Sequence, residues 1–205
     1  MEKDIVIIGA GGYAKSVIDA LDGRYSIKGF IDEYKTAKQH IGYPILGKKI
    51  EDLEKKEEYL YFIAIGDNKD RKYWFDKLKQ YKLEIVTIID KSAIVSKNAI
   101  LEEGCFVGKM AIVNSNARIG RNSIVNTKAL VEHGCIVGQH VNISTNTVLN
   151  GDVKVGDGCF VGSCSVVNGQ LSIGEWSIIG SGAVVVKNIE DYTVNVGIPA
   201  KKIKG

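Results

Sequence analysis

This chain of 205 residues has few prolines, little excess of one charge and no long apolar run near its start. Only 2 prolines occur beside 45% hydrophobic residues, which argues against a disordered chain. The 27 Lys and Arg against 24 Asp and Glu give a net charge of +3, so the charge indicates no nucleic-acid partner. The apolar run from Ile5 to Ile8 is too short for a signal peptide or a membrane span. We therefore expect a soluble, cytoplasmic protein without membrane insertion, with one large domain or two small ones.

The first part of the chain, residues 1–88, predicts alternating strands and helices. We expect strands at 4–8, 27–31, 60–65 and 85–89, and helices at 14–21 and 69–83. This order predicts a small parallel sheet with helices on its faces, an α/β unit that corresponds to half of a Rossmann fold.

A glycine loop, Gly9-x-Gly11-x-x-Ala14, joins the first strand to the first helix. Backbone N–H groups of such a loop hold phosphate, and Asp32 follows the second strand where a ribose-binding acid is expected. The ligand could be a dinucleotide or UDP. Alternatively, the loop could be a tight turn that binds no ligand. UDP is favoured, because residues 1–88 make only half of a full dinucleotide-binding fold.

The second part, residues 89–205, has a strict period of six. Every sixth residue from Ile89 to Val185 is Val, Ile or Leu, and most residues four positions further on are small. Six residues make one short strand and a corner, so three units predict a triangular coil with the aliphatic side chains inside. Three cysteines fall on the small inward position and one lies next to it: Cys105, Cys135, Cys159 and Cys164. We expect buried small side chains there, and neither metal ligands nor disulfides.

The hexad pattern resembles the left-handed parallel β-helix of hexapeptide-repeat acyltransferases. The ending Gly197-Ile198-Pro199-Ala200-Lys201 is similar to the Gly-x-Pro-Ala-Lys tail that often follows such helices. With the glycine loop in front, residues 3–205 resemble the bacterial enzymes that N-acetylate UDP-linked 4-amino-sugars of the bacillosamine type. The related sialic acid O-acetyltransferases are similar too. The resemblance implies a nucleotide-sugar-binding α/β domain at 1–88, a left-handed β-helix acetyltransferase domain at 89–205, and a homotrimer.

The resemblance also implies the chemistry and its ligands. Acetyl-CoA would be the cosubstrate, no metal would be needed, and the acceptor would be a UDP-amino-sugar of surface glycan synthesis. Residues at the nucleotide-sugar site would be Gly11, Gly12, Tyr13, Asp32, Glu33 and Gly66. Residues at acetyl-CoA would be Asn142, Gly151, Ser163 and Ser181, with Lys187, Lys201 and Lys202 as plausible phosphate partners. An O-acetyltransferase for sialic acid or a related sugar is the nearest alternative.

His133 is the candidate general base. Acetyl transfer needs a group of near-neutral pKa to take the proton of the attacking amine or hydroxyl, and histidine suits this task. From its spacing alone, His133 could equally be a solvent-exposed histidine at a corner of the coil without a catalytic role. Gly151 lies one full coil further on, so it is predicted to stack beside His133 and to offer a backbone N–H to the oxyanion. The resemblance implies the same two roles.

The residue after His133 departs from the family pattern. Many relatives carry Glu or Asp there, whereas this chain has Gly134. Glu132, Asn126 or a backbone carbonyl could orient the ring instead. Because of Gly134, the protein could also be a nucleotide-binding scaffold without turnover. His140 is expected at the surface, and its spacing from His133 fits no metal site that we recognise.

Overall fold

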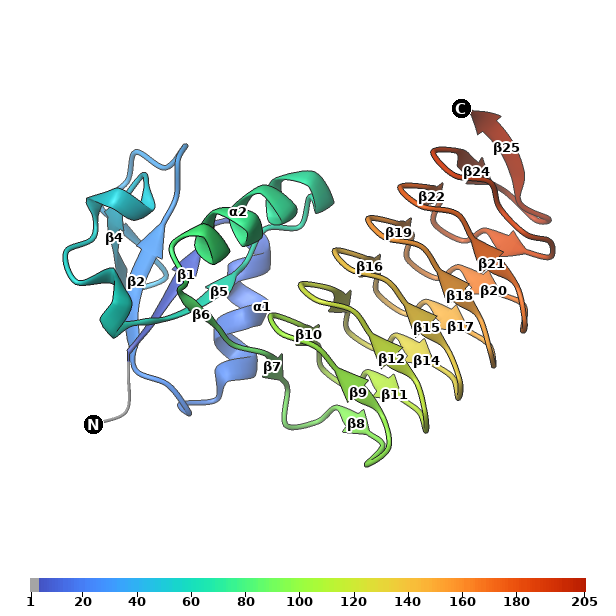
Figure 1. Ribbon diagram of the computed structural model, residues 1–205, viewed down its shortest axis with the longest axis horizontal. Coiled ribbons are helices and arrows are strands. Elements are labelled where there is room, and N and C mark those ends of the chain that lie inside the picture. Colours follow the sequence, from blue (N-terminus) through green and yellow to red (C-terminus); the bar gives the residue numbers. More distant parts are fainter. Residues whose placement is uncertain (1–3) are drawn as a thin grey trace.

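The computed structural model describes residues 4–205, so the first three residues of the predicted N-terminal domain lie outside it. It shows a small α/β domain packed against the first coils of a long triangular β-helix (Figure 1). Within residues 4–205 there is no helix with the length and apolar character needed to cross a membrane.

The α/β domain is a twisted sheet with one helix on each face. Its strand order is β3-β4-β2-β1-β5-β6, and β2, β1, β5 and β6 run parallel. Alternate residues of β1 explain the two layers, because Ile5 and Ile7 pack with α1 whereas Val6 and Ile8 pack with α2. The elements are β1 (Ile5–Ile8), α1 (Gly12–Leu21), β2 (Ile27–Ile31), β3 (Gln39–His40), β4 (Tyr43–Gly47), two 3₁₀ turns (Ile50–Asp52 and Lys56–Glu58), β5 (Leu60–Ile63), α2 (Asn68–Gln80) and β6 (Glu84–Ile85).

The strand predicted at 85–89 is two strands in different sheets. β6 pairs with β5 of the α/β sheet, and β7 (Ile88–Ile89) pairs with β10 of the β-helix. The change of partner occurs after Val86, whose N–H still bonds to Tyr61, while the N–H of Ile88 bonds to Cys105. The single apolar run therefore carries the chain from one domain into the next.

The β-helix confirms the predicted period and fold class. Three parallel sheets form its faces, and the inward Val, Ile and Leu side chains make one continuous core. Cys105, Cys135 and Cys159 are buried in it, and all four cysteines are free. The expectation of burial is wrong for Cys164, which is exposed because it lies in the turn, one residue before the inward position of Ser165. The first face holds β7, β10 (Phe106–Val107), β13 (Ile124–Val125), β16 (Asn142–Ile143), β19 (Phe160–Val161), β22 (Ile178–Ile179), β24 (Val194–Val196) and the antiparallel β25 (Lys201–Lys204).

The other two faces are shorter. The second face holds β8 (Ile94–Val95), β11 (Ile112–Val113), β14 (Leu130–Val131), β17 (Val148–Leu149), β20 (Val166–Val167) and β23 (Val184–Val185). The third face holds β9 (Ile100–Leu101), β12 (Arg118–Ile119), β15 (Ile136–Val137), β18 (Lys154–Val155) and β21 (Ser172–Ile173).

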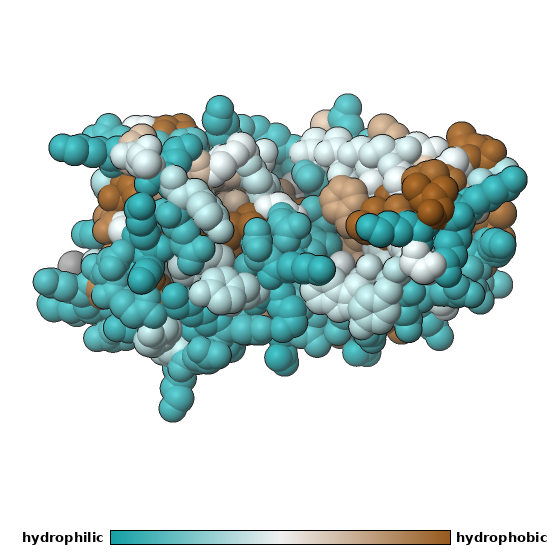
Figure 2. Space-filling model, turned by 90° about the horizontal axis from the view of Figure 1, so that it is seen from above, coloured by the Kyte–Doolittle hydropathy of each residue, from teal (hydrophilic) through white to brown (hydrophobic). Residues whose placement is uncertain are grey.

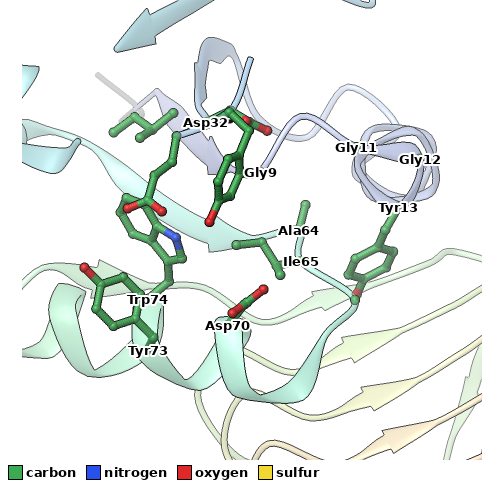
Figure 3. Close-up of a pocket in the computed structure, with 14 residues that line it drawn as sticks. Gly9, Gly11, Gly12, Tyr13, Asp32, Ala64, Ile65, Asp70, Tyr73 and Trp74 are labelled. Carbon is green, nitrogen blue, oxygen red and sulfur yellow. Dashed lines mark hydrogen bonds between the residues drawn. The ribbon is translucent and has the colours of Figure 1, made fainter. Parts of the chain in front are cut away.

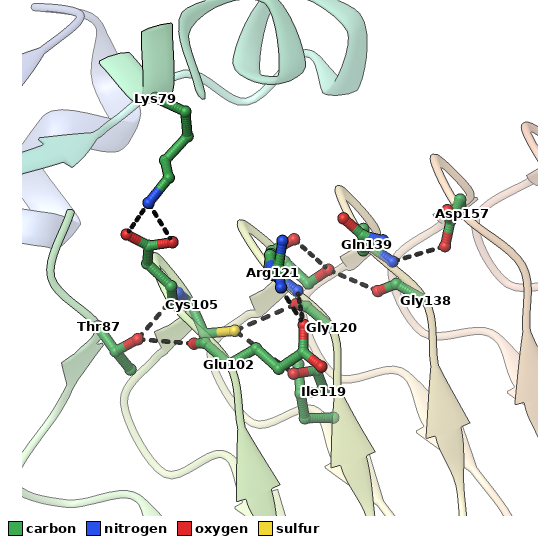
Figure 4. A network of polar contacts seen from close by, with 12 residues as sticks. Lys79, Thr87, Glu102, Cys105, Ile119, Gly120, Arg121, Gly138, Gln139 and Asp157 are labelled. Atoms are coloured by element: carbon green, nitrogen blue, oxygen red, sulfur yellow. Dashed lines mark hydrogen bonds and ion pairs between the residues drawn. The ribbon is translucent and has the colours of Figure 1, made fainter. Parts of the chain in front are cut away.

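Arg71 of α2 joins the two domains. Its side chain is 1% exposed and donates to the carbonyl oxygens of Asn122 (2.9 Å) and His140 (2.8 Å) on two coils of the β-helix. It also donates to the carbonyl of Gly66 at 3.0 Å. Burial lowers the pKa of Arg71 to about 10, so the guanidinium keeps its charge at neutral pH. Ion pairs such as Lys79 with Glu103 (2.8 Å) also cross the interface, but they are exposed and contribute little (Figure 4).

The expectation that His140 lies at the surface is wrong. His140 is 5% exposed, because α2 covers its corner of the coil. Its ring meets Phe75 edge-on at 5.4 Å, and its Nδ1 pairs with the side-chain amide of Asn122 at 2.9 Å. Burial lowers the pKa of His140 to about 4, so this ring is neutral at pH 7 and serves the domain interface.

Candidate active site

A cavity of about 440 Å³ opens at the carboxyl ends of β1, β2 and β5. This is the edge where open parallel sheets bind their ligands. All six residues predicted at a nucleotide-sugar site line this one cavity: Gly11, Gly12, Tyr13, Asp32, Glu33 and Gly66.

The carboxylate of Asp32 shapes the glycine loop. It accepts hydrogen bonds from the N–H groups of Ala10 (2.7 Å), Tyr34 (3.0 Å) and Lys35 (2.9 Å). The start of α1 at Gly12 has no capping side chain among the described residues, and a Cβ on Gly12 would meet nothing within 4 Å. The loop therefore presents uncapped N–H groups to the cavity, as a phosphate-binding turn does.

The opposite wall of this cavity comes from α2, which the sequence reasoning missed. Asp70, Tyr73 and Trp74 line it, and Figure 3 shows Asp70 between these rings and the start of α1. α2 begins shortly after β5, at the same sheet edge as the glycine loop. The position of this helix in the sequence was therefore the signal from which its place in the cavity wall could have been predicted.

A second cavity of about 430 Å³ lies between α1 and the β-helix. It shares Gly12, Tyr13 and Gly66 with the first cavity and reaches Asn126 and Asn142 on the coils. Two buried polar atoms beside it have no hydrogen-bond partner within residues 4–205, the hydroxyl of Tyr13 and Oδ1 of Asn142. Burial raises the pKa of Tyr13, so the hydroxyl stays protonated. Unpaired buried polar atoms are costly, and a polar ligand would satisfy both.

His133 lies exposed in the turn after β14, and it stacks on Gly151 as predicted. A Cβ on Gly151 would lie 2.6 Å from Cε1 and 2.8 Å from Nε2 of the ring, so only glycine leaves room for the imidazole. The N–H of Gly151 donates to no acceptor within residues 4–205. The site thus combines an accessible imidazole with a free backbone donor.

Glu132 does not contact the ring of His133. Its Oε2 accepts from the side-chain amide of Asn114 at 2.9 Å and from the N–H of His133 at 3.2 Å. The carboxylate therefore holds the backbone of the turn.

The predicted acetyl-CoA residues divide between two corners of the β-helix. Ser163 and Ser181 follow β19 and β22 of the first face, the same face that carries Asn142 in β16 and Asn126 directly after β13. Gly151 follows β17 of the second face, at the same corner of the β-helix as His133, which follows β14. No group of three or more His, Cys, Asp or Glu side chains that could hold a metal occurs in the described part of the chain.

Both halves of the chain match known protein families. Residues 4–78 match the PglD N-terminal domain, and residues 134–169 and 152–187 match the bacterial transferase hexapeptide (six repeats). A histidine variant of perosamine N-acetyltransferase from Caulobacter crescentus, solved with CoA and GDP-perosamine, has a TM-score of 0.95 and 31% identity. That match covers 100% of this chain and 99% of the relative.

Two further relatives support the same family assignment. The acetyltransferase domain of PglB from Neisseria gonorrhoeae, solved with acetyl coenzyme A, has a TM-score of 0.93 and 29% identity, over 99% of this chain and 100% of that one. UDP-N-acetylbacillosamine N-acetyltransferase from Bacillus subtilis is 34% identical over 113 residues, 51% of each protein. The chain spans about half or less of the length of the curated relatives it matches.

Proposed function

The chain belongs to the acetyl-CoA-dependent sugar N-acetyltransferases that join a PglD-type N-terminal domain to a hexapeptide β-helix, and from this premise we propose its acceptor and mechanism. The acceptor is a nucleotide-linked 4-amino-sugar for surface glycan synthesis. The α/β domain is only half a dinucleotide fold, which favours a nucleotide-sugar over a dinucleotide. UDP is the nucleotide of first choice, since the Bacillus relative is named for a UDP-sugar. GDP is the second choice, because the Caulobacter relative was solved with GDP-perosamine.

The two adjacent cavities, which share Gly12, Tyr13 and Gly66, each hold one part of the acceptor. The diphosphate binds the N–H groups at Gly11 and Gly12, and the nucleoside lies toward Glu33 and α2. The sugar enters the second cavity, where its hydroxyl and amino groups pair with the Tyr13 hydroxyl and Oδ1 of Asn142. The observation that carries this placement is the pair of unpaired buried polar atoms.

His133 acts as the general base. The amine attacks the thioester carbonyl of acetyl-CoA while Nε2 or Nδ1 of His133 takes its proton. The N–H of Gly151 donates to the oxyanion of the tetrahedral intermediate. Collapse of the intermediate breaks the C–S bond, and the coenzyme A thiolate leaves and regains a proton. Glu132 supports this step by holding the backbone of His133.

The acceptor cavity and His133 of one chain lie at different corners. The second cavity borders the corner after β13 and β16, whereas His133 follows β14, one whole face later. A face spans roughly 15 Å of extended chain at about 3.3 Å per residue, too far for direct proton transfer. A neighbouring copy therefore supplies His133 to the acceptor, and coenzyme A lies between two β-helices, touching Ser163 and Ser181 of one and Gly151 of the other.

Self-association also has a suitable surface. The outward side chains along the second face are aliphatic in six successive coils and not fully buried: Ile94, Ile112, Leu130, Val148, Val166 and Val184. Apolar patches also gather at the C-terminal end of the β-helix (Figure 2), where Ile198 is 77% exposed and Ile203 is 65% exposed. A row of this kind is typical of a subunit interface, and we propose a homotrimer.

An acceptor panel tests this function. Free thiol released from acetyl-CoA is measured with UDP- and GDP-linked 4-amino-sugars, the matching 4-hydroxy sugars and free sialic acid, and mass spectrometry identifies the product. We expect release and an N-acetyl product only with a nucleotide-linked amino-sugar. Release only with sialic acid would establish the O-acetyltransferase instead, and no release with any acceptor would favour a scaffold without turnover.

A further inference from the structure

The turn that carries His133 has a carboxylate beside it that comes from the next coil. Gly134 adopts φ +68°, and a Cβ built on it would collide with Oδ1 of Asp152. The carboxylate of Asp152 thus fills the space that a side chain at position 134 would occupy. No other residue type fits at 134 while Asp152 keeps this position.

The imidazole of His133 and the carboxylate of Asp152 cross between the same two coils. The ring reaches forward from one coil and lies against Gly151 of the next. The carboxylate reaches back from that coil and lies against Gly134. These two columns of stacked residues are one residue apart, about 3.8 Å between Cα atoms, so the two side chains are neighbours.

Two other aspartates also reach back over a glycine of the preceding coil, from one position further along the turn, and show what a structural role looks like. Asp157 lies over Gly138 and accepts the N–H of Gln139 at 2.8 Å (Figure 4). Asp191 lies over Gly174 and accepts the N–H of Glu175 at 2.8 Å. Both carboxylates cap a backbone donor of the preceding turn.

Asp152 lacks this structural role. Within residues 4–205 its carboxylate accepts no hydrogen bond and forms no ion pair. Asp152 stacks directly on Gly134 one coil earlier, whereas Asp157 and Asp191 each lie one position further along their turn than the residue that stacks on their glycine. The charged residues at this corner, in the coils at 114–116, 132–134, 150–152 and 168–170, are Glu132, His133 and Asp152. Because Glu132 is occupied by Asn114 and the N–H of His133, Asp152 holds the free negative charge nearest to the ring along the corner.

We propose that Asp152 stabilises the imidazolium that His133 becomes when it takes the proton of the attacking amine. This inference rests on the proposed function for its catalytic consequence. Asp152 is a positioning residue, since it acts on His133 through space and touches no reacting atom. A neighbouring carboxylate favours the protonated imidazole and makes the neutral ring a stronger base. Closure of the corner by a neighbouring copy would reduce solvent screening of the pair.

Asp152→Asn tests this, with Asp157→Asn and Asp191→Asn as matched controls in other coils. We expect Asp152→Asn to lower kcat roughly threefold to tenfold with little change in KM. Both controls should keep the wild-type kcat and KM. The loss should shrink in high salt, because wild type then loses the screened charge interaction as well.

A swap of the carboxylate gives a second test. Gly134→Asp combined with Asp152→Gly returns an acid to the turn, and both residues tolerate the left-handed backbone found at these positions. We expect this double variant to recover most of the kcat that Asp152→Asn loses. A merely structural role for Asp152 predicts no recovery.

NMR spectra of the His133 ring separate this inference from the proposed function, because they need no turnover. We expect Asp152→Asn to change the chemical shifts of the ring, whereas Asp157→Asn and Asp191→Asn leave them unchanged. Unchanged ring shifts, or a kcat equal to that of the control variants, overturn the inference alone. Absence of acetyl transfer by wild type overturns the proposed function, while changed ring shifts in Asp152→Asn would still establish the His133–Asp152 interaction.

Discussion

Gly151 lies so close against the imidazole of His133 that a β-carbon on it would be 2.6 Å from Cε1 of the ring. The two residues are one coil apart, and parallel stacking of the coils brings them together. Glycine is required here by the close approach of the ring. The contact involves the edge of the imidazole that carries Nε2 and Nδ1, which would lie 2.8 and 3.3 Å from that β-carbon.

Gly151→Ala therefore should displace the ring of His133, the proposed general base. We expect kcat to fall by about a hundredfold, since a shift of about 1 Å in a reacting group costs this much. Steady-state release of free coenzyme A measures the loss. Thermal unfolding should show little change, because the corner is at the surface and His133 can rotate away.

The double variant His133→Ala with Gly151→Ala supplies the control. Because the added methyl acts through the ring, the double variant should be no slower than His133→Ala alone. A wild-type kcat in Gly151→Ala would mean that the ring does not act from its observed position.

The period of six predicted the stacked pair and the buried cysteines, because a coil repeat fixes which residues become neighbours. It could not predict the position of His140, since the corner of that coil is buried by α2 of the other domain. The acidic and aromatic wall from Asp70 to Trp74 was missed although its helix closely follows β5. The helical period alone does not tell which side chains of that helix face the cavity.

The buried guanidinium of Arg71 should be the main polar contributor to the domain interface. Arg71→Met keeps the volume but leaves the carbonyls of Asn122 and His140 without their donor. We expect a loss of about 3 kcal/mol or more in unfolding free energy, which lowers the melting temperature by roughly 6–12 °C. Calorimetry measures this shift.

Arg71→Lys and Lys79→Ala are the comparisons for that experiment. Lysine cannot reproduce the forked donor pattern, so Arg71→Lys should fall between wild type and Arg71→Met. Lys79 forms an exposed ion pair, and its removal should cost less than about 1 kcal/mol. Equal effects of Arg71→Met and Lys79→Ala would contradict the assigned role of Arg71.

Acid should destabilise the fold through His140. Burial lowers the pKa of His140 from 6.5 to about 4, so the unfolded chain binds a proton between these values that the folded protein does not. Stability is therefore lost as pH falls from about 6.5 toward 4 and is unaffected by this group above 6.5. Thermal unfolding across this range should show a steeper slope for wild type than for His140→Asn. Parallel slopes would show that His140 does not titrate in this way.

Two inactive variants should restore activity when they assemble together. In the proposed mechanism Asp32→Ala disrupts the nucleotide cavity and His133→Ala removes the base, so each variant alone is expected to form an inactive homotrimer. If a neighbouring copy supplies His133, each trimer that contains both variants keeps one intact site of its three, so about one third of the wild-type activity is expected. Co-expression with two affinity tags isolates the mixed trimers for assay. Complete inactivity of the mixed trimers would place both halves of the site in one chain.

The most direct measurement of the central claim is the single-turnover rate of acetyl transfer in wild type and His133→Ala. Acetyl-CoA and the active nucleotide-linked amino-sugar are held at saturation, and nucleotide binding is measured on the same samples. We predict a fall of about 10²–10⁴-fold in the rate for His133→Ala with unchanged nucleotide affinity, as expected for loss of a general base. A rate within a few-fold of wild type, at equal affinity, would contradict the assignment of His133 as the base.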